Sequence, residues 1–439
     1  MDYKKKLITV EEALKLVKSG DHIFSGMMAA EARLFLSKLH ELPADIKDVK
    51  VTNCLPMLDA KYFTEKEYAD RFTIESWFFS GALRKAFANG NIHYIPNHLH
   101  LAAHDRLTHT RPDIYVGVVT PPDKNGFMSL SLSNVYEKRM LQAAKMVILE
   151  INPNFPRTHG DVEVHVDDVD YLIETDYPVP ELPDGELTEK DIIIGNLIAE
   201  RINDGDCLQL GIGGIPNAVA AALVNKKDLG VHTEMLTTGF MKLYKAGAIT
   251  GKYKKTHPGK MVAAFALGTR ELYDFIDDNP AVEIRDGKYV NDPHNIGLND
   301  NQVSINSTIE IDLTGQCCSE AIGTRQFSGT GGQVDTAVGA QNSKGGRSFI
   351  ALYSTAMVRN KETGEREEVS KIVPVLKPGA PVTLSRNDVD YVVTEYGVVR
   401  LTGTTITERV ERLISIAHPK FREQLMKDAI KYGLHPGVK

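Results

Sequence analysis

The sequence predicts an α/β protein with two related open domains, each built on a mainly parallel sheet. Three observations lead to this prediction. Short apolar runs alternate with segments of helical periodicity, which is the order of elements in layered α/β folds. A proline-rich segment lies near the middle of the 439 residues. A pattern of glycine and aspartate on one side of this segment is repeated on the other.

Six apolar runs are expected to be buried strands. Each is nearly continuous in apolar character, as are the strands of a parallel sheet that is covered on both faces. They are DIYVGVV (113–119), MVILEI (146–151), CLQLGI (207–212), MVAAFAL (261–267), SFIALY (348–353) and YVVTEYG (391–397).

Five further segments carry apolar residues at helical spacing. We expect them to be helices that cover the sheets. They are VEEALKLVKSG (10–20), EARLFLSKLHEL (31–42), EKDIIIGNLIAERI (189–202), PNAVAAALVNK (216–226) and ITERVERLISIA (406–417).

The segment YPVPELPDGELTEKD, which starts at Tyr177, is the best candidate for a linker because it carries three prolines and a glycine. Thr188 and Asp191 follow it at the spacing of a helix cap. We therefore expect an N-terminal domain over residues 1–185 and a C-terminal domain over residues 186–439.

The two halves share a local pattern. VKSGDHIFSG (17–26) and INDGDCLQLG (202–211) have Gly, Asp and Gly at one constant offset. In both, a helical segment ends at glycine, a strand follows, and a second glycine opens the next helix. The match of three positions within one order of elements suggests that the two domains are related.

Composition excludes several classes of protein. The formal net charge of −7 argues against a nucleic-acid-binding protein, which normally has a basic face. No membrane helix is expected. The N-terminus has no apolar stretch of the secretory type. The four cysteines form no C-x-x-C motif, and reduced thiols in the cytoplasm are expected.

Two glycine-rich segments are candidate ligand loops. In QLGIGGIPNAV (209–219), glycines follow a strand and Pro216 stands just inside a helix, so backbone N–H groups can face a negative charge. Pro216 breaks the dinucleotide fingerprint at its third glycine. In FSGTGGQVD (327–335) and NSKGGRS (342–348), glycines stand beside Lys344 and Arg347, as at a phosphorylated ligand. Tight turns alone would also explain both segments.

Other motifs are weaker by themselves. Glu234 in VHTEMLTTG (231–239) is, on local sequence alone, an ordinary charged residue. His98, His100, His104 and His109 lie close together but lack HExxH and acidic partners at ligand spacing, so no metal site is expected. The absence of G-x-S-x-G leaves a serine-hydrolase nucleophile without support.

Taken together, the motifs resemble the acetyl-CoA hydrolase/transferase family of CoA-transferases, with 4-hydroxybutyrate and butyryl-CoA:acetate CoA-transferases as the nearest members. The matches run in order along nearly the whole chain. They are TPPDKNGFMSLSLSN (120–134), EINPNFPRTHGD (150–161), QLGIGGIPNAV (209–219), GVHTEM (230–235), LGTRELYDFI (267–276), VNDPHNIGLNDNQVSIN (290–306), SGTGGQVD (328–335), SRNDVDYVVTEYG (385–397) and IAHPKFREQL (416–425).

The resemblance implies an active site in the cleft between two domains, with Glu234 as catalytic nucleophile. Its carboxylate would form an acyl-glutamyl anhydride with acyl-CoA and then a glutamyl-CoA thioester. Coenzyme A esters and short-chain carboxylates would be the substrates, with no other cofactor and no metal. A homodimer or higher homo-oligomer is also expected.

The resemblance also implies which residues contact CoA. The turn after the strand at 207–212 would line the thioester end, and the second glycine loop and a cation would contact the rest. The candidates are Gln209, Gly211, Ile212, Gly213, Gly214, Gly331, Gly332 and Arg347.

Three departures from the family pattern bear on acyl specificity: Ala32 after Glu31, Thr336 after SGTGGQVD, and the pair Cys317-Cys318. Met27 and Met28 would suit an adaptable apolar pocket. We expect CoA transfer between acetyl-CoA and a C4–C5 acid such as 4-hydroxybutyrate or butyrate. The alternatives are an acyl-CoA hydrolase, a transferase for itaconate or succinate, a non-catalytic sensor of CoA esters or sugar phosphates, and a nicotinamide dehydrogenase.

Overall fold

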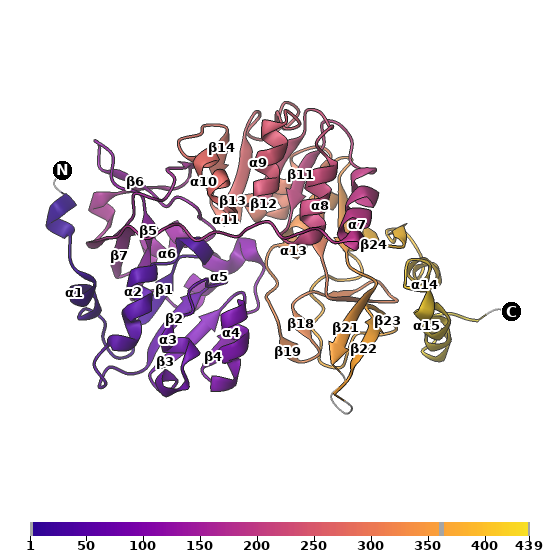
Figure 1. Ribbon diagram of the computed structural model, residues 1–439, viewed down its shortest axis with the longest axis horizontal. Helices are drawn as coiled ribbons and strands as arrows, with labels where there is room; N and C mark the ends of the chain where they lie inside the picture. Colours follow the sequence, from indigo (N-terminus) through magenta and orange to yellow (C-terminus); the bar gives the residue numbers. More distant parts are fainter. Residues whose placement is uncertain (1–2, 360–363, 438–439) are drawn as a thin grey trace.

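The computed structural model describes residues 3–359 and 364–437. Figure 1 shows the first half of the chain on the left and the second half in the upper middle, with small sheets below and helices α14 (Ile406–Ser415) and α15 (Pro419–Lys431) at the far right. The mixed α/β architecture with mainly parallel sheets confirms the predicted fold class.

The first sheet has seven strands, all parallel, in the order β10-β7-β5-β1-β2-β3-β4. Their bounds are β1 (His22–Ser25), β2 (Val49–Asn53), β3 (Phe72–Ser76), β4 (Ile92–Tyr94), β5 (Ile114–Val119), β7 (Met146–Ile151) and β10 (Tyr171–Glu174). Its helices are α1 (Val10–Leu14), α2 (Arg33–Lys38), α3 (Lys61–Thr64), α4 (Gly81–Ala86), α5 (Ala102–His109) and α6 (Glu137–Ala143).

The second sheet has nine strands, in the order β25-β24-β20-β15-β11-β12-β13-β14-β8. Their bounds are β8 (His159–Gly160), β11 (Cys207–Leu210), β12 (Gly230–Leu236), β13 (Met261–Ala266), β14 (Val282–Ile284), β15 (Gln302–Ser307), β20 (Arg347–Ala351), β24 (Tyr391–Thr394) and β25 (Gly397–Arg400). Its helices are α7 (Glu189–Ala199), α8 (Gly214–Ala222), α9 (Thr238–Lys245), α10 (Arg270–Ile276), α11 (Gly287–Asn291), α12 (Pro293–Gly297) and α13 (Gln333–Asn342).

Short strands complete the molecule. β6 (Phe127–Ser129) pairs with β9 (Glu163–His165) in the first half. The remaining small sheets are β17-β16-β23, β18-β19 and β21-β22. Their bounds are β16 (Glu310–Asp312), β17 (Cys317–Cys318), β18 (Ala321–Ile322), β19 (Arg325–Gln326), β21 (Thr355–Arg359), β22 (Arg366–Ser370) and β23 (Ile372–Val373).

The two sheets share one topology, which supports the predicted relation between the halves. In each, the first strand lies centrally, three later strands extend to one side, and the chain returns to extend the other side. The repeated motif has the same geometry in both: Gly20 and Gly205 have φ of +83° and +80°. Asp21 and Asp206 each accept a hydrogen bond from the backbone N–H three residues earlier. Such a doubly wound sheet places ligands outside the carboxyl ends of its strands.

One element crosses the predicted domain boundary at 185. β8 comes from the first half but pairs in parallel with β14 of the second sheet. The linker runs across both halves in Figure 1. It is tied to the second half by the hydrogen bond from the Tyr273 hydroxyl to the Pro180 carbonyl, 2.7 Å. The predicted cap forms a reciprocal capping box between Thr188 and Asp191.

Several predicted elements end earlier than expected, and two of them differ most from the prediction. The run at 391–397 is not one strand, because β24 ends at Thr394 and the chain reverses into antiparallel β25. Gly397, at φ +146°, gives the turn a conformation that other residues rarely adopt. The helix expected over 10–20 ends at Leu14, and looser turns continue to Val17.

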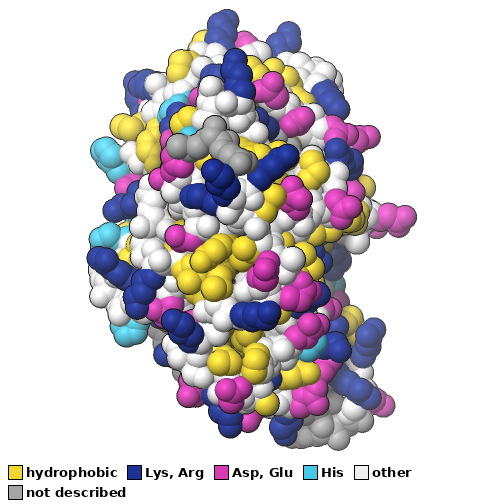
Figure 2. Space-filling view, turned by 90° about the vertical axis from the view of Figure 1, so that its left-hand side faces the viewer, with side chains coloured by type: hydrophobic (Ala, Val, Ile, Leu, Met, Phe, Trp, Pro, Cys, Tyr) yellow, Lys and Arg dark blue, Asp and Glu magenta, His cyan; other side chains and the backbone are white. Residues whose placement is uncertain are grey.

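One apolar core spans both sheets. It contains Phe24 of the first sheet and Leu208 of the second, both fully buried. All four cysteines are free and buried. On the face in Figure 2, basic and acidic side chains are interspersed among apolar ones. Within residues 3–359 and 364–437, no helix combines the length and apolar character needed to cross a bilayer.

Candidate active site

Glu234 lies on β12, near the carboxyl end of a central strand of the second sheet. β11 pairs with β12 only at Cys207 and Leu208 and then turns away. Glu234 is partly buried, whereas the residues on either side of it are buried. The strand therefore presents one carboxylate where the neighbouring strand has already ended.

Two nitrogen donors face this carboxylate. The amide Nδ2 of Asn291, the last residue of α11, donates to Glu234 Oε2 at 2.8 Å. The backbone N–H of Gly332, just before α13, lies against the carboxylate and favours its charged form. A β-carbon on Gly332 would lie 1.8 Å from Oε2, so only glycine leaves the carboxylate in place.

The surroundings raise the pKa of Glu234 to about 7. Burial is the main cause, because it disfavours the charged form, and the negative charge of Asp335 acts in the same direction. The hydrogen bonds from Asn291 and Gly332 oppose the rise in pKa. The result is a carboxyl group that changes its charge near neutral pH, as carboxylates with a chemical role often do.

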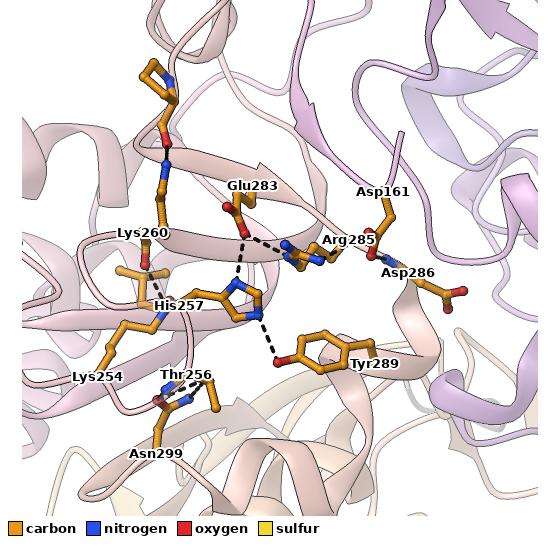
Figure 3. A network of polar contacts seen from close by, with 12 residues as sticks. Asp161, Lys254, Thr256, His257, Lys260, Glu283, Arg285, Asp286, Tyr289 and Asn299 are labelled. Carbon is orange, nitrogen blue, oxygen red and sulfur yellow. Dashed lines mark hydrogen bonds and ion pairs between the residues drawn. The ribbon is translucent and has the colours of Figure 1, made fainter. Parts of the chain in front are cut away.

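Helix α11 is held in place by polar contacts, most of which appear in Figure 3. The Tyr289 hydroxyl lies 3.0 Å from His257 Nε2, and His257 Nδ1 lies 3.0 Å from Glu283. Arg285 bridges Glu283 at 2.7 Å and Asp161 of the first half at 3.1 Å. The single turn that carries Asn291 is therefore anchored by both halves of the chain.

A second histidine, His232, also contacts the α11 turn. His232 lies on β12 two residues before Glu234, and its Nε2 is 2.8 Å from the Val290 carbonyl. Because a carbonyl only accepts, Nε2 carries the proton. Burial lowers the pKa of His232 to about 3, so the ring stays neutral and keeps this contact.

The turn after β11 lies at the carboxyl edge of the second sheet. Gly213 has φ +110°, a conformation that favours glycine, and α8 begins at Gly214. A β-carbon on Gly214 would lie 2.5 Å from Asp191, so this glycine also permits close packing of α7 on α8. Ile212 is 46% exposed. A β-carbon on Gly211 would make ordinary van der Waals contacts with the Ile305 carbonyl oxygen, at 3.8 Å, and with Pro216, at 3.9 Å.

Gln209 is a structural member of the sheet. It is 3% exposed, and its Oε1 accepts hydrogen bonds from Ser304 Oγ at 2.9 Å and from Ile305 N at 3.1 Å. These bonds join β11 to β15 at the point where the strand order reverses. Any contribution of Gln209 to a ligand site would therefore come through the strands that it holds together.

The second glycine loop lies between the two halves. A β-carbon on Gly329 would lie 2.2 Å from the Trp77 carbonyl, just beyond β3. Gly331 has φ +55°, and its carbonyl accepts from Leu99 N at 3.2 Å. Thr330 N donates to the Tyr94 hydroxyl at 3.0 Å. The loop that brings Gly332 to Glu234 is thus shaped by the first sheet.

Arg347 is not brought together with the other candidates. It begins β20, whose register with β15 places it at the amino edge of the sheet, opposite the glycine turns. Its guanidinium forms an ion pair with Asp206, which is 2% exposed. The structure gives Arg347 a structural partner in Asp206, and its contact with a phosphate stays a prediction.

The histidine cluster does not form a metal site in the described part of the chain, where no group of three or more His, Cys, Asp and Glu side chains could hold a metal ion. His104 pairs with Asp105 at 3.0 Å on the surface. His100 instead binds Asp335, whose carboxylate lies 2.8 Å from its Nδ1. Sequence reasoning missed the roles of Asn291, His100 and Asp335, although Asn291 and Asp335 lie within the recognised motifs at 290–306 and 328–335.

The fold and the site define an α/β enzyme in which one carboxylate lies between two duplicated halves. Residues 1–183 match the acetyl-CoA hydrolase/transferase N-terminal domain, and residues 268–429 match the corresponding C-terminal domain. The chain belongs to the acetyl-CoA hydrolase/transferase family, and it is a CoA-transferase.

Its relatives support this assignment. The chain is 44% identical over 428 residues to a succinyl-CoA:cyclohexane-1-carboxylate CoA transferase of Geobacter metallireducens, covering 98% of this chain and 96% of that protein. It is 43% identical to a 4-hydroxybutyrate coenzyme A transferase of Clostridium kluyveri, over 97% of each. The crystal structure of RipA from Yersinia pestis superimposes with a TM-score of 0.90 at 37% identity, over 98% of each chain. An acetyl-CoA hydrolase of Yarrowia lipolytica is more distant, at 27% identity over 55% of this chain and 43% of that protein.

Proposed function

We propose that this CoA-transferase moves CoA between acetyl-CoA and a C4–C5 carboxylic acid through a covalent intermediate on Glu234. The observation that carries the proposal is the Glu234 carboxylate, held by Asn291 at 2.8 Å and faced by the Gly332 N–H between the two halves. A binding module for CoA esters would have no need of a partly buried carboxylate oriented in this way.

The proposed transfer proceeds through two successive covalent intermediates on Glu234. A Glu234 oxygen attacks the thioester carbonyl of acyl-CoA and the C–S bond breaks. CoA is released as a thiolate, and the acyl group remains on Glu234 as an acyl-glutamyl anhydride. The thiolate then attacks the glutamyl carbonyl and releases the first acid as a carboxylate, which leaves glutamyl-CoA thioester. A second carboxylate reverses these steps. Thioester is exchanged for thioester, so the reaction requires no ATP.

The two nitrogen donors that face Glu234 are suited to these reaction steps. When the thiolate attacks the glutamyl carbonyl, negative charge develops on the glutamyl oxygen. The Asn291 amide and the Gly332 N–H already face that carboxyl group, so they can stabilise the charge without reorganising. The raised pKa of Glu234, about 7, gives a more basic carboxylate than an exposed glutamate and so a better nucleophile in its ionised form.

The acyl end is proposed to lie at the carboxyl edge of the first sheet. Met28 has φ +51°, and its N–H donates to the Cys54 carbonyl at 3.3 Å. The Met27 N–H donates to buried Glu137 at 2.9 Å. Burial raises the pKa of the Cys54 thiol, and the nearby negative charge of Glu234 raises that pKa further. We propose that Met27 and Met28, whose thioether side chains are adaptable, line the pocket for the acyl group.

The test is to trap the intermediate. Borohydride added after acyl-CoA reduces a glutamyl thioester to an alcohol, so we expect a lowered mass for the peptide that contains Glu234, and only when acyl-CoA is present. Glu234→Ala should abolish transfer while the melting temperature is kept. Glu186→Ala, which alters an exposed carboxylate in the linker, serves as the control. Near-normal turnover of Glu234→Ala would refute the mechanism.

Steady-state kinetics test the covalent route, and a screen of acceptor acids tests the acyl specificity. A covalent intermediate predicts ping-pong behaviour, with parallel double-reciprocal plots. Intersecting lines would indicate direct transfer. Mass spectrometry of the products from acetyl-CoA with 4-hydroxybutyrate, butyrate, propionate, succinate and itaconate would define the acyl group. Release of free thiol without any acceptor would favour the hydrolase alternative.

A further inference from the structure

His100 connects the first half of the chain to the loop that faces Glu234. It lies in the short 3-10 helix Leu99–Leu101, outside the second sheet. Its backbone N–H donates to Asp335 Oδ2 at 3.1 Å, and its ring Nδ1 lies 2.8 Å from Asp335 Oδ1. Asp335 is 1% exposed, and both of its oxygens are used by this one residue. His100 is therefore the hydrogen-bond partner, from the first half, of a buried carboxylate of the second half.

The residue before His100 also contacts the glycine loop that faces Glu234. Leu99 N donates to the Gly331 carbonyl at 3.2 Å, so consecutive residues of the first half hold Gly331 and Asp335. Gly332 lies between these two points and presents its N–H to Glu234. Asp335 belongs to the first turn of α13, which starts directly after Gly332. A movement at His100 would thus be passed to the turn that bears on the nucleophile.

We propose that His100 is a positioning residue for transfer, which fixes the turn from Gly331 to Asp335 across the two halves and sets the charge that faces Glu234. The proposal rests on Glu234 being the nucleophile, as proposed above. His100 does not touch the reacting atoms in this role. It acts through the Asp335 carboxylate and through the backbone of Gly332.

The charges around both groups agree with this role. Burial alone would lower the pKa of His100, but the hydrogen bond and charge of Asp335 outweigh it and raise the pKa. Asp292 beside α11 and Asp105 of α5 also favour the charged ring, and the ring of His98 stacks on it at 6.2 Å. Facing Glu234 are the negative charge of Asp335 and the neutral thiol of Cys54.

Loss of the His100 charge and loss of the Asp335 charge should shift the pKa of Glu234 in opposite directions. A protonated His100 compensates Asp335, and an uncompensated Asp335 raises the pKa of Glu234. Loss of the cation should therefore make Glu234 harder to ionise. Loss of the Asp335 charge should make it easier. A merely structural contact would lower stability in both cases without moving the ionisation of Glu234 in opposite directions.

The experiment compares His100→Asn, His100→Ala and Asp335→Asn in the full-length protein. Asparagine keeps a donor near the place of Nδ1 but carries no charge, so His100→Asn separates charge from hydrogen bonding. His98→Asn is the matched control, because His98 is exposed and stacks on His100 without binding the loop. Each variant is measured by the kcat/KM pH profile and by the infrared carboxylate band, with Glu234→Gln as the background.

We expect His100→Asn to move the infrared titration of Glu234 to higher pH. At about pH 6, kcat/KM of the variant should therefore lie further below its plateau than the roughly tenfold expected for the unaltered enzyme, whose Glu234 has a pKa of about 7. His100→Ala should add a loss at the plateau, and asparagine should rescue that loss. Asp335→Asn should move the titration to lower pH, and His98→Asn should not move it. An unmoved titration in His100→Asn, or a shift in the same direction for both charge variants, overturns the proposal. Turnover that survives in Glu234→Gln would instead refute the nucleophile, and the infrared titration would still decide the role of His100.

Discussion

Gly332 shows how one absent methyl group defines this site. Its backbone, at φ −98° and ψ 15°, suits any residue, so conformational freedom does not explain the glycine. Space explains it, because a β-carbon would collide with both Glu234 Oε2 and Asn291 Nδ2, at 1.8 and 2.2 Å. The sequence pattern indicated a loop that contacts CoA. The structure shows that at least one of its glycines also serves the carboxylate.

Gly332→Ala is therefore predicted to reduce kcat by about 10²-fold or more, because it displaces the carboxylate and its donors. The collision should also lower the free energy of unfolding by roughly 1–3 kcal/mol. Gly403→Ala is the control, because Gly403 has φ +76° and no atom within 4 Å of an added β-carbon. That variant should lose roughly 1 kcal/mol of unfolding free energy through backbone strain and keep its kcat. A Gly332→Ala enzyme with normal kcat would contradict this contact between Gly332 and Glu234.

Asn291 is predicted to control the acid limb of the pH profile. The Glu234 carboxylate is the reactive form, so kcat/KM should fall as pH drops through about 7, the pKa of that group. The Asn291 hydrogen bond lowers this pKa, so Asn291→Ala should shift the limb to higher pH and reduce kcat by roughly 10²-fold. Asn291→Asp should shift it further, because it places a second negative charge beside the first. A limb that stays in place in both variants would exclude the role.

At the scale of elements, β12 and α11 form the scaffold of the site. β12 supplies Glu234 and His232, which lie two residues apart and so on one face of the strand. α11 is a single turn, too short to be stable alone. The polar contacts of Tyr289, Val290 and Asn295 tie it to its surroundings. The geometry at Glu234 therefore depends on contacts made several residues away.

Tyr289→Phe tests this dependence. It removes the hydroxyl contact to His257, at 3.0 Å, and should lower the free energy of unfolding by about 1 kcal/mol. Because Asn291 lies on the same turn, kcat should fall severalfold while the KM for acyl-CoA changes less. Tyr253→Phe, at a residue that is 57% exposed, should change neither quantity. A stability loss with unaltered kcat would show that α11 does not need this anchor for catalysis.

At the scale of the whole molecule, the duplicated halves act as one body. The apolar core that contains Phe24 and Leu208 spans both sheets. β8 extends the second sheet from the first half. The loop at 327–332 is bonded to Phe79, Tyr94 and Leu99 of the first half. The site therefore requires both halves and their mutual orientation.

Thermal unfolding is accordingly predicted to be a single cooperative transition. A continuous core makes the loss of one half expose apolar surface of the other, which opposes independent melting. Differential scanning calorimetry would check this, with a calorimetric enthalpy close to the van't Hoff enthalpy. Two resolved transitions would show that the halves unfold separately despite the shared core.

Much of this architecture was determined by the sequence alone. Apolar runs identified the central strands, because a strand covered on both faces has few polar residues. Glycine and aspartate at constant offset identified the duplication, because the same turn before the same strand needs the same residues. The capping pair Thr188 and Asp191 marked the start of α7. Glu234 was found through its motif, because a lone carboxylate has no local signature.

Only the tertiary structure decided which side chains meet. Asn291 and Gly332 reach Glu234 from positions 57 and 98 residues away (291 − 234 and 332 − 234). Arg347 beside two glycines suggested a phosphate contact, but Asp206 at the amino edge of the sheet holds it. His100, which local spacing placed with other histidines, instead holds Asp335 across the two halves. Local sequence records propensity and periodicity over a few residues, whereas these pairings depend on how two sheets pack against each other.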